Sequence, residues 1–144
     1  MKHPIKKPLL YLAAPLFSEA ERRFNEELRD LLVAESYEVY LPQESGESVD
    51  PKDSRPDRRT FLHHLEALRG ADGLVAVCDG PDTDSGTSWE MGYAYALGIP
   101  VIALRTDRRR AAGGRILNLM LGESSMIATK KEEIVSLLEV ILKK

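Results

Sequence analysis

Short apolar runs alternate along this chain with longer stretches of helical periodicity, and that alternation limits the folds open to it. The runs lie at residues 9–14, 38–41, 74–78, 101–104 and 126–128. Those at 9–14 and 74–78 are apolar throughout, which is typical of strands buried on both faces. Strands separated by helices form a parallel sheet with right-handed crossovers and helices on both faces. The sequence therefore predicts one α/β domain over residues 1–144, doubly wound in a flavodoxin-like or Rossmann-like order around a five-stranded parallel sheet.

The segments between these runs predict helices and loops. Ser18 and Glu21 fit a capping box that starts a helix with Phe24 and Leu28 on its apolar face. Residues 43–57 are polar and have no apolar period, which predicts a long loop of the kind that often acts as a lid. Further helices are expected over residues 58–69, 87–97 and 131–142, with a short helical turn at 116–121.

Length and composition exclude several classes of protein. A chain of 144 residues is the size of one domain. Its net charge of −3, without a basic amphipathic helix, argues against a nucleic acid polymer or a membrane surface as partner. No apolar stretch is long enough to span a membrane, and residues 1–8 lack the apolar core of a signal peptide, so we expect a cytoplasmic protein that binds a small molecule. The one cysteine, Cys78, is expected to be a buried structural thiol.

Residues 79–98 carry the strongest indication of chemistry, because their loop follows a predicted strand at the edge where open α/β sheets form ligand crevices. The loop holds four acids or hydroxyls, Asp82, Asp84, Ser85 and Thr87. We expect Glu90 in the first turn of the next helix, where the helix dipole favours an ionised carboxylate and therefore a nucleophile. Asp84 can fold back toward Glu90, so that two carboxylates surround one reacting centre. The alternative is that these acids only cap the helix and stabilise the loop.

The predicted topology brings two further residues to this loop. In a flavodoxin-like sheet the first and third strands end side by side at the switch point. Tyr11 and Phe17, at the end of the first strand and just beyond it, should then share one cleft with Glu90.

Three motifs together resemble a known family. They are YLAAPLF from Tyr11, DSGTSWEMGYA from Asp84 and NLM from Asn118. With these motifs in this order, the chain resembles the nucleoside 2-deoxyribosyltransferase family over nearly its whole length. The pattern D-x-G-x-x-x-E-x-G-Y-A is the specific part of the resemblance, and the other two motifs add weight through their order and spacing.

The resemblance implies an activity and its central residues. The family transfers 2-deoxyribose from a deoxynucleoside to a free nucleobase by double displacement, without a cofactor. Glu90 would attack the anomeric carbon to form a deoxyribosyl ester, as in retaining glycosidases. Asp84 would lie beside the sugar and base, and Tyr11 would orient Glu90 through a hydrogen bond.

The resemblance also implies substrate contacts and an oligomer. Phe17 would wall the base, and Gly86 and Thr87, within the same motif as Glu90, are candidate substrate-binding residues. Asn118 and Met120 match residues that reach the site from a neighbouring subunit. The protein would then be a homodimer or a higher homo-oligomer with shared sites.

One position departs from the family's pattern. Several members carry an aspartate on the second helix where His64 stands here, so the group that handles the proton of the base is open. His64 can serve as donor, although a helix histidine next to His63 is more often a surface or interface residue. Asp79 and Asp82 are other candidates for base contacts, each with an alternative role in stabilising the loop.

Other prominent residues have structural explanations. Trp89 and Tyr93 are expected to pack between helix and sheet. The arginines of residues 105–115 either clamp a phosphate or form a solvated basic loop. No cluster has metal-ligand spacing and no phosphate-binding glycine motif follows the first strand, so neither a metal nor a dinucleotide is expected.

Three other functions compete with transfer. Some hydrolases of deoxynucleoside 5′-monophosphates look alike here but carry serine where Asp84 stands, because a carboxylate repels a phosphate. Residues 86–90 also resemble the G-T-x-x-E of lysine-decarboxylase-like phosphoribohydrolases, whose P-G-G stretch is missing. A nucleotide-sensing module would bind without turnover, and would not need Tyr11, Asp84 and Glu90 together.

Overall fold

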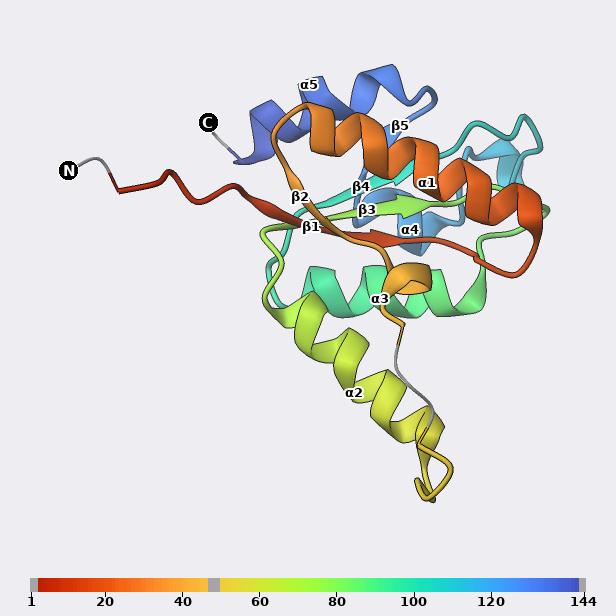
Figure 1. The fold of residues 1–144 in the computed structure, drawn as a ribbon. Coiled ribbons are helices and arrows are strands. Elements are labelled where there is room, and N and C mark those ends of the chain that lie inside the picture. Colours follow the sequence, from red (N-terminus) through yellow and green to blue (C-terminus); the bar gives the residue numbers. More distant parts are fainter. Residues whose placement is uncertain (1–2, 47–49, 143–144) are drawn as a thin grey trace.

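The computed structural model describes residues 3–46 and 50–142, and its centre is one parallel sheet (Figure 1). The strand order is β2-β1-β3-β4-β5, and every pairing is parallel. This is the flavodoxin-like order, so the predicted fold class is confirmed. The strands are β1 (Leu9–Ala13), β2 (Glu38–Tyr40), β3 (Gly73–Val77), β4 (Val101–Leu104) and β5 (Met126–Ala128).

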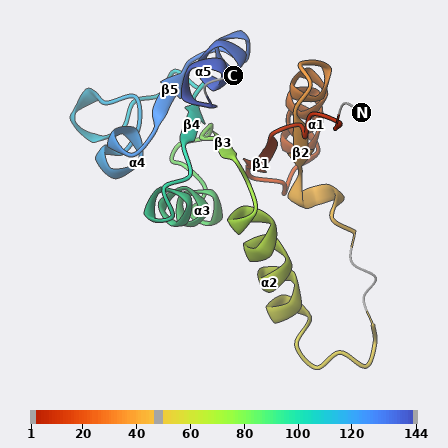
Figure 2. The same cartoon turned by 90° about the vertical axis from the view of Figure 1, so that its left-hand side faces the viewer.

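Helices lie on both faces of the sheet. One face is covered by α1 (Glu19–Ala34) and α5 (Glu132–Leu142), and the other by α3 (Ser85–Ala96) (Figure 1). In contrast, α2 (Pro56–Arg69) extends away from the body of the molecule (Figure 2), and Leu68 is its one buried residue. One side of this helix is therefore left to line a cavity rather than to fill the core.

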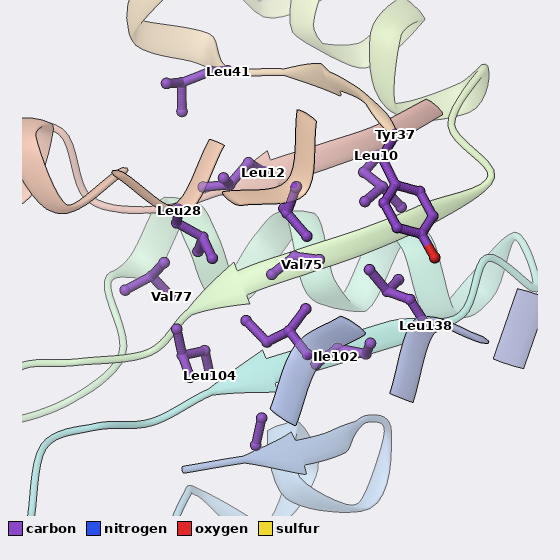
Figure 3. Close-up of a cluster of buried hydrophobic side chains, with 13 residues drawn as sticks. Leu10, Leu12, Leu28, Tyr37, Leu41, Val75, Val77, Ile102, Leu104 and Leu138 are labelled. Carbon is purple, nitrogen blue, oxygen red and sulfur yellow. The ribbon is translucent and has the colours of Figure 1, made fainter. Parts of the chain in front are cut away.

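The alternation of side chains along the strands divides the core in two. Leu10 and Leu12 point to the face covered by α1 and α5, where Leu28 and Leu138 complete one cluster (Figure 3). Tyr11 lies between them in sequence and so points to the opposite face, toward α3. This alternation is what places the Tyr11 side chain near the α3 helix.

Local sequence signals set several element boundaries. The expected capping box is present, since Ser18 Oγ accepts from the Glu21 N–H at 3.1 Å and Glu21 Oε1 accepts from the Ser18 N–H at 2.8 Å. Helix α2 begins two residues earlier than expected because Pro56 fits a first helical position. Helix α4 (Leu119–Glu123) begins later than expected because Asn118 caps it, accepting from the Met120 N–H at 2.9 Å.

The segment expected to be a long polar loop is only partly irregular. A 3₁₀ helix covers Pro42–Glu44, and residues 56 and 57 belong to α2. Residues 47–49 of this segment lie outside the described residues, so its role as a lid stays a prediction.

Candidate active site

A cavity of about 580 Å³ lies between the end of β1, helix α2 and the N-terminal half of α3. Its walls are mostly apolar, with a few polar groups that converge on it, which is the usual character of a small-molecule site. The residues that line it are Tyr11, Ala14, Leu16, Phe17, Pro42, Phe61, His64, Leu65, Leu68, Asp84, Ser85, Gly86, Trp89 and Glu90.

Glu90 and Tyr11 meet at one wall of this cavity. The Tyr11 hydroxyl is fully buried and hydrogen-bonds to the Glu90 carboxylate, which is partly buried. Burial and the neighbouring negative charge raise the pKa of Tyr11 well above its usual range, so Tyr11 stays protonated and its hydroxyl donates a hydrogen bond to the carboxylate. The two residues whose segments the topology was expected to bring together are therefore in contact.

The expectation that Glu90 lies in the first helical turn is wrong. Helix α3 begins at Ser85, with Asp84 as its N-cap, so Glu90 is the sixth residue of the helix and lies in the second turn. Burial is the largest influence on its pKa and raises it, the Tyr11 hydrogen bond lowers it and the Asp84 charge raises it, which together bring the pKa to about 7. Desolvation therefore outweighs the Tyr11 hydrogen bond, and the carboxylate is poised between its two protonation states near neutral pH.

Asp84 both starts α3 and lines the cavity. Its Oδ2 accepts from the Thr87 N–H at 3.0 Å and from the Thr87 hydroxyl at 3.3 Å. Thr87, which makes both of these hydrogen bonds, is buried, while Gly86 lines the cavity. A Cβ on Gly86 would lie 3.2 Å from Asp84 Oδ2, so a larger residue there would press on the carboxylate.

A second polar pair lies beside the same cavity, formed by Tyr40 of β2 and His64 of α2. The Tyr40 hydroxyl and His64 Nδ1 are 2.7 Å apart, and His64 lines the cavity. The Tyr40 ring stacks on Tyr11, with centroids 5.2 Å apart. Sequence reasoning did not identify Tyr40, because nothing local to it indicates that α2 passes close by.

The aromatic side chains of α2 and α3 form an outer wall, which corrects the expectation for Trp89. Trp89 is 50% exposed and does not pack between helix and sheet. Its ring stacks on Tyr93 at 5.2 Å and meets the edge of Phe61 at 5.7 Å. Because α2 leans out from the body, Phe61 and Trp89 line the cavity where α2 meets α3, whereas the half-buried Tyr93 packs against the core on this face of the sheet, as expected.

The structure does not bring Asp79 or Asp82 to the cavity wall. Asp79 accepts hydrogen bonds from the Thr106 N–H, the Thr106 hydroxyl and the Asp107 N–H, at 2.7, 2.5 and 2.9 Å, and so ties the end of β3 to the end of β4. Asp82 is exposed and accepts from the Thr83 N–H at 2.9 Å. Both placements match the loop-stabilising alternative, and their base contacts stay predictions.

The basic loop after β4 is organised by a buried arginine. Arg105 is 4% exposed and donates to the carbonyls of Cys78 and Gly80 at 2.5 and 2.7 Å. None of the arginines of residues 105–115 lines the cavity. Cys78 itself is fully buried, as expected, and burial raises the pKa of its thiol to about 12, so it is not a nucleophile.

Three further candidates lie at or beyond the cavity's edge. Phe17 lines the cavity and is 72% exposed. Asn118 and Met120 lie outside it, both exposed on the start of α4. Their expected contact with a neighbouring subunit is therefore open to test.

The described residues include no group of three or more His, Cys, Asp or Glu side chains that could hold a metal ion. Among the described helices, none combines the length and apolar character needed to cross a membrane.

Comparisons with known proteins identify a family for this chain. The family model for nucleoside 2-deoxyribosyltransferase matches residues 10–120. A conserved protein from Enterococcus faecalis V583 is 28% identical, with a TM-score of 0.81 over 94% of this chain and 99% of that chain. A 2-deoxyribosyltransferase from Bacillus psychrosaccharolyticus is 26% identical, with a TM-score of 0.76 over 88% of this chain and 89% of that chain.

The fold also recurs at lower identity. A CMP N-glycosidase from Clostridium botulinum is 23% identical, with a TM-score of 0.57 over 92% of this chain and 98% of that chain. No curated protein matches the sequence.

Proposed function

The chain belongs to the nucleoside 2-deoxyribosyltransferase family, and from this premise we propose that it transfers 2-deoxyribose from a deoxynucleoside to a second, free nucleobase. Membership indicates an enzyme that acts on nucleosides, as a transferase or an N-glycosidase. Transfer through a covalent intermediate is the finer step that we propose here.

The proposed reaction has two displacements at the anomeric carbon. In the first, a Glu90 oxygen bonds to C1′ while the C1′–N bond breaks and its electron pair leaves with the base. In the second, a nitrogen of the incoming base bonds to C1′ and Glu90 leaves with its electron pair. Two inversions retain the configuration of the sugar, as in retaining glycosidases. Tyr11 acts as a positioning residue for Glu90, and the Asp84 carboxylate stabilises the positive charge that develops on the sugar ring.

The observation that carries this proposal is the Glu90 carboxylate held by the Tyr11 hydroxyl at the wall of the cavity. Because burial opposes its ionisation, this carboxylate costs folding stability, which a merely capping acid at a helix start would not do. A module that only bound nucleotides would have no use for it.

The charge of the cavity favours a nucleoside over its 5′-monophosphate. Of the described residues that line it, none is lysine or arginine, whereas two are carboxylates, Asp84 and Glu90. A phosphate would meet repulsion without a compensating cation. Hydrolysis of monophosphates, the competing activity, therefore has no support from this chain's own cavity.

The test is to incubate the protein with 2′-deoxyadenosine, with and without a second base such as cytosine. We expect a new deoxynucleoside only when the second base is present. Glu90→Gln and Glu90→Ala should abolish it, whereas Glu139→Gln, an exposed acid on α5, should not. Retained cleavage in either Glu90 variant would refute the assignment of the nucleophile.

The intermediate can be sought directly. Without an acceptor, rapid acid quench and mass spectrometry should find one deoxyribosyl group on the peptide that contains Glu90. An unmodified peptide during turnover would indicate direct displacement instead.

We further propose that the enzyme is a homo-oligomer in which Asn118 and Met120 complete the site of a neighbouring subunit. Both are exposed and lie outside their own cavity, and Leu119 between them is 49% exposed. An exposed apolar segment beside a polar cap residue fits a subunit contact.

A further inference from the structure

We infer that Phe61 and Trp89 keep water away from the sugar while it is bound to Glu90, so that the sugar passes to a second base and not to water. These two side chains, the ring pair, lie on different helices, α2 and α3. The inference rests on the proposed transfer at Glu90 and deepens it, because it names the residues that favour transfer over hydrolysis.

The first support is the place of the ring pair in the cavity wall. Phe61 and Trp89 both line the cavity that contains Glu90, and Trp89 directly precedes Glu90 in the chain. The edge of the Phe61 ring meets the Trp89 ring, with centroids 5.7 Å apart. Phe61 belongs to the outer half of α2, the helix that leans away from the body (Figure 2). The ring pair therefore joins the two helices where they diverge.

The second support is a row of contacts that holds the ring pair in place. At one end, the Arg58 guanidinium lies 5.6 Å from the centre of the Phe61 ring. On the other side, the Trp89 ring stacks on Tyr93, whose hydroxyl accepts from Arg69 Nε at 2.6 Å. Stacked rings and cations above rings both stabilise such contacts. Because both arginines belong to α2, the row runs from α2 to α3 and back, and it fixes both rings.

The third support is the apolar wall that continues from the ring pair. Phe61, Leu65 and Leu68 follow one another at helical spacing on α2, and all three line the cavity. A water molecule is held in a cavity by about two to four polar partners, and these side chains offer none. A nucleobase has a flat aromatic face that stacks on such rings. This part of the wall therefore favours a base over water.

Transfer and hydrolysis compete for the same bond. In transfer, a nitrogen of the second base bonds to C1′ while the bond from C1′ to Glu90 breaks and its electron pair returns to the carboxylate. In hydrolysis, the oxygen of water bonds to C1′ and the same electron pair returns to Glu90. In either case the attacking group loses one proton, which is released to the solvent. Because water is far more concentrated than any free base, transfer requires that water be excluded.

The experiment measures how the bound sugar divides between a base and water. The protein is incubated with 2′-deoxyadenosine and cytosine, and the initial rates at which 2′-deoxycytidine and free 2-deoxyribose form are measured in the same reaction. The ratio of these rates depends neither on the folded fraction nor on the rate of the first displacement. A second measurement, without cytosine, gives the rate of hydrolysis per sugar bound to the Glu90 peptide after acid quench.

For Phe61→Ala and Trp89→Ala we expect the ratio of 2′-deoxycytidine to free 2-deoxyribose to fall about tenfold, because alanine opens the wall and removes a stacking surface. Hydrolysis per bound sugar should rise in both. Phe61→Tyr and Trp89→Phe keep a ring and should retain most of the ratio. The matched control is Tyr95→Ala, which removes a 63% exposed ring of α3 outside the cavity and should leave the ratio unchanged.

The outcomes separate the two proposals. An unchanged ratio in either alanine variant, or hydrolysis per bound sugar that does not rise, would overturn the role of the ring pair and leave transfer at Glu90 intact. A full shift in Phe61→Tyr would overturn it as well. If Trp89→Ala is inactive, Phe61→Ala on the other helix decides alone. If the wild-type protein forms no 2′-deoxycytidine, the proposed function itself fails.

Discussion

Replacing Tyr11 by phenylalanine should raise the pKa of Glu90. The substitution removes one hydroxyl and keeps the ring that stacks on Tyr40. The lost hydrogen bond favours the ionised carboxylate, while burial and Asp84 oppose it. Without the Tyr11 hydroxyl, only the opposing effects remain, so Glu90 should hold its proton to higher pH.

The magnitude follows from the strength of such a bond. Hydrogen bonds to charged groups contribute about 1.5–3 kcal/mol, and one pKa unit corresponds to about 1.4 kcal/mol. Because Glu90 is only partly buried, we take the lower end and expect a rise of about one unit, from about 7 to about 8. At pH 7 the ionised fraction should then fall from about a half to about a tenth, which alone slows the first displacement about fivefold.

The assay is carbon NMR of protein labelled at the glutamate carboxyl carbons, titrated with pH. The Glu90 resonance is assigned by its disappearance in Glu90→Gln. Tyr95→Phe, on the same helix but 63% exposed, is the matched control and should leave the midpoint where it is. A midpoint in Tyr11→Phe that is unchanged or lower would refute the reasoning that this hydroxyl supports the carboxylate.

Three further results are expected. Glu90→Gln should raise the melting temperature at pH 8 but not at pH 4. The pKa of the Glu90 carboxyl rises on folding, so this group destabilises the fold as pH rises from 4.5 to about 7, by about 1–2 kcal/mol after allowance for partial exposure. An equal effect at both pH values would contradict this. Trp89 is the one tryptophan and lines the cavity, so a bound nucleobase should quench its fluorescence in saturable fashion, and an unresponsive signal would place the base elsewhere. Mixing Glu90→Ala with Asn118→Ala should restore part of the activity through mixed interfaces, whereas a fully active Asn118→Ala or a strictly monomeric active protein would exclude shared sites.

The fold was predictable because its signals are local. Apolar runs and helical periods gave all five strands in the observed order. The capping box of Ser18 and Glu21 needs only four consecutive residues to form, and it is present. The meeting of Tyr11 with Glu90 also followed, since the switch point of the sheet is a property of strand order.

The details of the site depend on distances that a sequence does not contain. The expected start of α3 at Thr87 overlooked Asp84 as the cap, and the shift to Ser85 moved Glu90 into a more buried turn, where desolvation decides its pKa. Trp89 was assigned to the core on its size alone. Its exposure, like the contact of Tyr40 with a residue 24 positions away, follows from the angle at which α2 leaves the body.

The dual position of Asp84 restricts how this cavity can evolve. The residue that we propose lies beside the sugar is also the N-cap of α3, and only serine, threonine, asparagine, aspartate and, less well, glycine fill that position without weakening the helix. Exchange among these residues changes the wall from a carboxylate to an amide or a hydroxyl at a cost below about 1 kcal/mol. Substrate preference can therefore change at this one position through single substitutions, while the helix that carries Glu90 keeps its starting point.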